Sequence, residues 1–178
     1  MPSFKLEDVT SGRFDWALLK NGPVHLFGRA NVLEAAISEL AKAGYLIHDV
    51  DAGPWTSEGD MHDALSSALS FPDYYGRNLD ALNDCLSDVA YYSYGSREDT
   101  VGTVLVLRHF DRFGGLNRRS AHVLLDSYAG QARRALLIGH RMICLVQSDD
   151  PDISFEAVGS TTVMWNPAEW LASKRTRG

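Results

Sequence analysis

The chain has little cysteine and no long hydrophobic run, and each absence excludes a class of protein. Its two cysteines, Cys85 and Cys144, lack the spacing of a zinc site or a CxxC redox motif, so we expect buried, reduced thiols. The longest apolar runs, such as residues 104–107, are far too short to cross a bilayer. The opening residues MPSFKLED lack a signal-peptide pattern. The sequence predicts a cytoplasmic protein without membrane contact, and secretion stays open only if a leader preceded residue 1.

Motifs that mark common enzyme sites are also missing. The sequence contains no GxxxxGK[ST], GxGxxG, GxSxG or HExxH, and its six histidines lack the spacing of metal ligands. His109 and Asp111 follow a predicted strand, where α/β enzymes keep catalytic groups, but no nucleophile or second acid is indicated nearby. Asp80 and Asp84 make a poor cation site without further oxygen ligands. We therefore expect no enzyme, no cofactor and no metal.

Hydrophobic periodicity predicts strands that alternate with helices. The predicted strands cover residues 23–27, 45–50, 103–110, 142–147 and 160–165. Four helices are predicted from their caps and their stops. The first is capped by Asn31 with Glu34 and ends at Gly44, and the second is capped by Thr56 or Ser57 and ends before Pro72. The third covers residues 79–90 and is capped by Asn78, and the fourth is capped by Ser120 and stops at Gly139. Residues 111–117 are expected to form a loop. The resulting β-α-β-α-α-β-α-β-β order predicts an α/β fold with a mainly parallel sheet of four to five strands and helices packed on it.

We expect residues 1–178 to form a single domain, since this length can bury a real hydrophobic core. Residues 44–148 would be its core, 1–43 an added strand–helix unit, and 149–178 an added strand and tail. Each addition is expected to contribute an edge strand, and the first dozen residues and the tail are expected to be frayed. The expected state is a monomer, although the sequence carries no signal for oligomeric state.

Acidic residues are concentrated in one part of the chain. The net charge is −6, yet residues 44–96 contain nine acids and one base, a net charge of −8, and the rest of the chain carries +2. A single-sign field of this kind repels nucleic acid and attracts a basic partner. The alternative is that the acids only aid solubility.

The stretch FPDYYGRNLDALNDCL at residues 71–86 lies within this acidic part. If the leucines of the predicted helix face the core, Asp80 and Asp84 project outward with Asn83 beside them. Tyr74 and Tyr75 point in opposite directions if the loop is extended, so at least one should lie beside the acids. A tyrosine with two carboxylates suits a basic pocket on a partner. The alternative interpretation is a buried Tyr75, a Tyr74 that closes the turn, and a solvated helix face.

The same stretch resembles the signature of barstar-type ribonuclease inhibitors, P-x-Y-Y-G-x-N-L-D-A-L-x-D-C-L, with all twelve of its fixed positions matched from Pro72 to Leu86. In element order the resemblance extends from Tyr45 to Gln147. It implies a small α/β protein with a parallel sheet, of a family that is intracellular in bacteria and blocks a secreted ribonuclease before export.

The resemblance also implies a binding site and a mechanism. Tyr74, Asp80 and Asp84 match the family's contact residues, and nearby positions of the footprint are Gly76, Asn78, Leu79 and Asn83. Asp84 would enter the active-site pocket of the enzyme in place of the RNA phosphate. Asp80 would pair with a flanking base, and Tyr74 would pack against a catalytic side chain. The implied function is an inhibitor or immunity protein whose partner is a basic bacterial ribonuclease or ribonuclease-like toxin.

Three positions depart from the family pattern. Arg77 and Asn83 stand where barstar has glutamate and tryptophan, and Arg77 adds a positive charge near a surface meant for a basic enzyme. Ala129 stands where the family has an acidic contact, with Asp126 as a nearby candidate. An interaction module with a non-nuclease partner, or a small enzyme that uses His109 and Asp111, therefore stays as an alternative.

Overall fold

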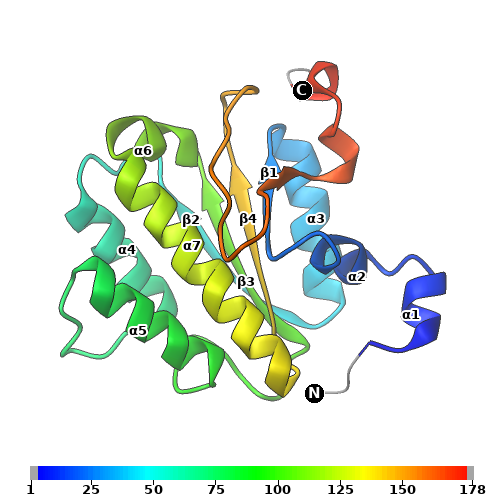
Figure 1. Ribbon diagram of the computed structural model, residues 1–178, viewed down its shortest axis with the longest axis horizontal. Helices are drawn as coiled ribbons and strands as arrows, with labels where there is room; N and C mark the ends of the chain where they lie inside the picture. The colour runs from blue at the N-terminus through cyan, green and yellow to red at the C-terminus, as the bar shows by residue number, and fades with distance from the viewer. Residues whose placement is uncertain (1–3, 176–178) are drawn as a thin grey trace.

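Parallel strands form the sheet that organises the chain, and the computed structural model describes residues 4–175 (Figure 1). In this part of the chain the sheet has five strands in the order β2-β3-β4-β1-β5. Every neighbouring pair is parallel. The strands are β1 (Val24–Phe27), β2 (Tyr45–Asp51), β3 (Gly102–Arg108), β4 (Arg141–Gln147) and β5 (Met164–Trp165). The predicted α/β class with a parallel sheet is confirmed.

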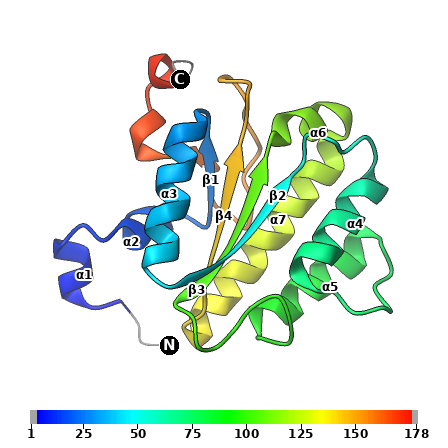
Figure 2. The same cartoon turned by 180° about the vertical axis from the view of Figure 1, so that it is seen from behind.

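Helices cover both faces of this sheet (Figure 2). Helices α2 and α3 pack on one face, while α4, α5, α6 and α7 pack on the other. The α-helices are α1 (Leu6–Thr10), α2 (Phe14–Leu19), α3 (Ala30–Lys42), α4 (Glu58–Leu69), α5 (Leu79–Ala90), α6 (Phe110–Leu116) and α7 (Arg118–Ala135). The 3-10 helices are η1 (Leu136–Ile138), η2 (Pro167–Glu169) and η3 (Ala172–Lys174). Cys85 and Cys144 are buried free thiols.

The central strand β3 has apolar side chains on both faces of the sheet, so helices must pack on both faces to bury them. Val104 and Val106 pack into the cluster beneath α3, whereas Leu105 and Leu107 pack into the cluster beneath the helices of the other face. All four side chains are fully buried, and each stabilises the fold by about 1.5–3 kcal/mol. This is the pattern predicted for a parallel strand with helices on both sides.

Strand β1 is an interior strand, so the expectation that it lies at an edge is wrong. It pairs with β4 on one side and with β5 on the other, and all four of its residues are buried. The chain after β4 returns to place β5 beyond β1, and β5 becomes the edge. Only two residues form β5, fewer than the predicted 160–165, because Thr161 pairs antiparallel with Val158 in a tight turn.

Residues 4–12 contain a helix where fraying was expected. Residues 4–12 include α1, and α2 follows with Asp15 only 2% exposed. Asp15 accepts hydrogen bonds from Arg13 Nε at 2.8 Å and from the hydroxyl of Tyr45 at 2.6 Å, and it pairs with Arg141 Nη1 at 3.3 Å. These contacts tie α2 to the first residues of β2 and β4. Residues 1–3 and 176–178 lie outside the described residues.

Two helix starts and one loop differ from prediction. Helix α3 begins at Ala30, so Asn31 lies inside it and is not its cap. Helix α7 begins at Arg118, because Asn117 Oδ1 accepts the backbone N–H of Ser120 at 3.0 Å and so caps the helix in place of Ser120.

Residues 110–116 form helix α6 where a strand end and a loop were expected. His109 ends β3 in a left-handed conformation, with φ of 51°. The rings of Phe110 and Phe113 then pack edge-on against Trp55. The helix therefore fills the end of the core beyond β3.

Candidate protein-binding site

The cap of helix α5 sets which of its residues face solvent, and these include Asp80 and Asp84. Asn78 has extended backbone angles, and its Oδ1 accepts the N–H of Ala81 at 2.9 Å, so the helix starts at Leu79 as predicted. Leu82 on the same helix is fully buried. Asp80 and Asp84 lie on the opposite side and are exposed.

We call Tyr74, Asp80 and Asp84 the acidic surface. Within residues 4–175, no hydrogen-bond donor or cation contacts either aspartate carboxylate, and the two acids lie one helical turn apart. The ring of Tyr74 is 80% exposed. These three side chains are therefore available to a partner without breaking any contact inside the fold.

Tyr75 anchors the loop that carries Tyr74. Its ring is 9% exposed and packs edge-on against Phe71, and its hydroxyl bonds His62 Nδ1. The other ring nitrogen of His62 lies 3.2 Å from Glu58, which also accepts a hydrogen bond from Ser120 on α7. Burial raises the pKa of the Tyr75 phenol. The loop is thus fixed to both α4 and α7, with one tyrosine inside and the other outside.

The guanidinium of Arg77 contacts α4, and it does not pair with Asp80 or Asp84. Its backbone is left-handed, with φ of 49°, and its guanidinium pairs with Asp63 on α4 at 2.9 Å. The same group donates to the carbonyl of Gly59 at 3.4 Å. The positive charge that departs from the family pattern therefore has an acidic partner on the neighbouring helix.

The other residues of the predicted footprint have structural roles as well. A Cβ at position 76 would lie 3.0 Å from the side-chain amide nitrogen of Asn78, so the capping side chain would have to shift to accept any other residue there. Leu79 is partly buried against the core. Asn83 Oδ1 accepts a hydrogen bond from Gln131 Nε2 on α7 at 3.0 Å, which commits part of this amide to the contact between α5 and α7.

A groove of about 450 Å³ runs along the junction of α5 and α7, and Asp80 of the acidic surface lines it. Its lining includes Asp80 and Asn83 from α5 and Arg119 and Arg134 from α7. Sequence reasoning did not find the two arginines, although both fall outside the apolar stripe predicted for α7. The groove therefore carries charges of both signs.

Position 129, where the family has an acidic contact residue, is buried in this structure. Ala129 is 1% exposed, so no contact with a partner can be made there. Asp126 accepts the N–H of Gly159 at 2.9 Å, which fixes the turn after Val158 onto α7. Its carboxylate is already engaged and does not simply replace the family contact.

The candidate catalytic pair His109 and Asp111 is not formed. His109 Nδ1 lies 2.8 Å from Asp149, and Asp111 accepts the backbone N–H of Asp149 at 3.0 Å, so both residues bond Asp149 and not each other. A hydrogen bond from Gln147, with His109 nearby, holds the pKa of Asp149 below its usual range. The cluster joins the ends of β3 and β4. Within residues 4–175, no group of three or more His, Cys, Asp or Glu could hold a metal, and no helix could span a membrane.

The family of the chain follows from comparison with known proteins. The model of the family described as Barstar (barnase inhibitor) matches residues 45–147, more than half of the chain. The chain belongs to the barstar family. The match begins with the first residue of β2 and ends with the last of β4, so α1–α3, β1 and β5 lie outside the barstar segment.

One curated relative matches the chain over a short stretch. It is a Bacillus subtilis (strain 168) protein named "Putative ribonuclease inhibitor YrdF", 70% identical over 27 residues. These residues are 15% of this chain and 30% of the relative, so the chain spans about a third of the length of the curated relative it matches. The similarity supports the family assignment over that stretch.

Proposed function

We propose that this barstar-family chain binds a bacterial ribonuclease or ribonuclease-like toxin and blocks its active site. The observation that carries the proposal is the pair of carboxylates on α5, Asp80 and Asp84, which are exposed and contact no donor or cation of the described residues. A carboxylate left without a partner keeps its full capacity to accept charge-assisted hydrogen bonds from arginine or lysine. The proposal includes no catalytic step and no cofactor.

In this mechanism the acidic surface takes the place of an RNA phosphate. Asp84, at the middle of α5, enters the basic pocket, and Asp80 pairs with a base at its rim. Tyr74 supplies exposed aromatic area against the enzyme. The net charge of −8 in residues 44–96 steers a basic enzyme toward this side of the molecule. The remaining footprint residues are Gly76, Asn78, Leu79 and Asn83.

The proposal includes a setting for the complex. The chain acts as a monomeric single domain in the bacterial cytoplasm, where it protects the cell as an immunity protein. An alternative is an interaction module with a non-nuclease partner. The buried Ala129 and the arginines of the α5–α7 groove favour that alternative, since both depart from a uniformly acidic contact face.

An inhibition assay with barnase as the probe tests the proposal. Wild-type protein should abolish RNA hydrolysis at a one-to-one ratio. Asp84→Ala should weaken binding by about a hundredfold or more, because breaking a buried charge pair costs about 3–5 kcal/mol and each 1.4 kcal/mol is tenfold. Its thermal midpoint should stay near that of wild type, since the carboxylate makes no internal contact within residues 4–175.

Glu39→Ala is the matched control. Glu39 is an exposed carboxylate on α3, on the other face of the sheet, and among the described residues its side chain pairs only with Lys42, at 3.6 Å. This variant should inhibit as wild type does. Full inhibition by Asp84→Ala would exclude the proposed mechanism. A wild-type chain that inhibits neither barnase nor any ribonuclease of its source organism would favour the non-nuclease alternative.

A further inference from the structure

The end of α7 and the 3-10 turn after it carry a second unusual surface. Arg133 and Arg134 are followed by Leu136, Leu137 and Ile138, whose side chains are 46%, 87% and 46% exposed. We call these five residues the basic–apolar surface. Isolated exposed leucines are ordinary, whereas contiguous exposed apolar side chains bordered by polar residues are a feature of contact sites.

The two arginines are free to bind a partner. Within residues 4–175, neither Arg133 nor Arg134 contacts a carboxylate, whereas Arg77 and Arg108 both form ion pairs. A position in the last turn of α7 favours cations, because the carbonyl end of a helix carries partial negative charge. That effect explains the charge at this point of the helix, but it does not explain the exposed leucines that follow.

Hollows beside the surface provide room for side chains of a partner. One of about 440 Å³ is lined by Arg133, Arg134 and Leu137 together with Gly159 and Ser160 of the neighbouring turn. It adjoins a second of about 530 Å³, since Arg133, Gly159 and Ser160 line both.

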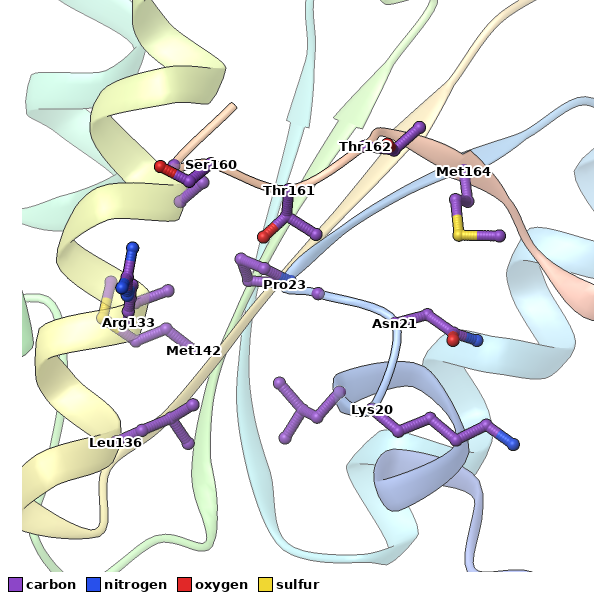
Figure 3. A pocket seen from close by; sticks show the side chains of 15 residues that line it. Lys20, Asn21, Pro23, Arg133, Leu136, Met142, Ser160, Thr161, Thr162 and Met164 are labelled. Carbon is purple, nitrogen blue, oxygen red and sulfur yellow. The ribbon is translucent and has the colours of Figure 1, made fainter. Parts of the chain in front are cut away.

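The larger hollow has a mixed lining of apolar and polar residues. Figure 3 shows Arg133 and Leu136 on the α7 side of it, with Pro23 and Thr161 across from them. Met142 and Met164 add apolar lining. Residues 19–23 and 159–164, which form the far wall, lie outside the barstar segment, so this site depends on the additions to the family fold.

We propose that the basic–apolar surface binds an acidic amphipathic segment of a partner protein. Aliphatic side chains of the segment pack on Leu136, Leu137 and the apolar residues that line the larger hollow, and its carboxylates pair with Arg133 and Arg134. A basic ribonuclease does not fit here, because the arginines repel it. Nucleic acid or an anionic lipid surface would also extend over the acidic surface, which the groove with Asp80 and Arg134 joins to this site, and would be repelled there. A short acidic segment can contact the arginines without covering Asp80 and Asp84.

A binding assay with a designed peptide tests this inference without any ribonuclease. The probe is a fluorescent peptide of about 14 residues, with leucines at helical i, i+3, i+4 spacing and glutamates elsewhere. Fluorescence anisotropy should show saturable binding to the full chain, and amide NMR shifts should map to α7, η1 and residues 158–164. A peptide with lysine for glutamate, and one with serine for leucine, should each bind about tenfold more weakly or not at all.

Peptide binding by variants of the chain tests whether the basic–apolar surface is the binding site. Arg133→Glu combined with Arg134→Glu should weaken peptide binding at least about tenfold, and Leu137→Ser about threefold or more. Leu137 is 87% exposed, so its replacement should not affect folding. Lys42→Glu, an exposed cation on α3, is the control and should bind as wild type does. Asp84→Ala should also leave peptide binding intact, which separates this site from the acidic surface.

Three outcomes would overturn the inference. The first is an absence of peptide binding by the correctly folded chain. The second is an equal loss in Lys42→Glu, which would indicate only general charge attraction. The third is concentration-dependent dimerisation that Arg134→Glu abolishes, or binding to anionic vesicles in preference to the peptide, which would assign the surface to a second copy or to a membrane.

Discussion

Two groups of carboxylates in this chain have opposite surroundings. Asp15 is 2% exposed and is bonded by Arg13, Tyr45 and Arg141. Asp84 is exposed on α5 and has no partner among residues 4–175. Burying a charge without partners is costly, so an internal carboxylate must be surrounded by donors, while one reserved for another molecule must stay in water until that molecule supplies them. The surroundings therefore separate acids that hold the fold from acids suited to recognition.

Glu169, like Asp15, is a buried carboxylate that accepts several hydrogen bonds within the fold. Its side chain is fully buried and accepts the backbone N–H groups of Gly28 at 2.8 Å and Arg29 at 2.7 Å, and the amide of Asn166 at 2.7 Å. These bonds place a negative charge at the start of α3, where the helix dipole favours it. Both buried acids lie outside the barstar segment, and both fasten an addition to the sheet.

The largest effect on stability should come from Asp15. Asp15→Ala leaves the buried guanidinium of Arg141 without this partner, and losing one member of a buried pair costs about 3–5 kcal/mol. Urea unfolding should show this loss, with barnase inhibition unchanged under conditions where the variant is folded. An Asp84→Ala protein that loses equal stability would remove the distinction between the two groups of acids.

An intermediate effect is expected from Glu58, which joins α4 to α7. The hydrogen bond from Ser120 holds the pKa of Glu58 below its usual range, with a smaller contribution from His62. A carboxyl with a lowered pKa in the folded state adds stability above its unfolded pKa of about 4.3, and this stability is lost as the pH falls through the folded value. Glu58→Gln should therefore lose less stability than wild type between neutral pH and pH of about 3.

Urea midpoints measured across that range check this prediction. Glu39→Ala, which removes an exposed acid with a single surface pair, is the control and should follow the wild-type curve. Identical pH dependence in wild type and Glu58→Gln would show that the contact with Ser120 does not contribute.

The smallest effect is expected from Arg77. Its pair with Asp63 is exposed, and surface pairs contribute about 0–1 kcal/mol. Arg77→Ala should change the free energy of unfolding by no more than this, and should change barnase affinity by less than about threefold, because the charge is already paired. A much tighter complex would instead show that Arg77 opposes the acidic surface despite its pair.

Local sequence was sufficient to predict helix α5 but not the contacts made by the additions to the barstar segment. Asn78 and the spacing of the leucines predicted α5 correctly, since a cap and an apolar stripe are local features. The sequence suggested Asn31 as the cap of α3. The acceptor that in fact bonds the backbone N–H of Arg29 at the start of this helix is Glu169, which lies 140 residues away in the sequence and so is not visible to local reasoning. Helix α6 was missed because its phenylalanines continue the apolar run of β3, and only the left-handed His109 marks the change.

The direction of individual side chains was also beyond local reasoning. The sequence showed that Tyr74 and Tyr75 differ but not which is buried, and that depends on His62 and Phe71. Arg77 was expected to oppose the acids because its partner on α4 could not be foreseen. The roles of Tyr74, Asp80 and Asp84 remain a prediction for binding experiments.

Because β1 is an interior strand, it cannot pair with β4 until most of the chain has been synthesised. Val24 pairs with Cys144, so the ribosome must make about 120 more residues before the partner strand exists, which takes on the order of ten seconds at about 5–20 residues per second. Until β4 exists, the apolar sides of α2 and α3, with Leu18, Leu33 and Leu40, can pack only on β2 and then β3, and the part of the cluster that Ile143 and Leu145 of β4 supply is missing. We therefore expect the nascent amino-terminal segment to keep part of its apolar surface exposed until β4 emerges.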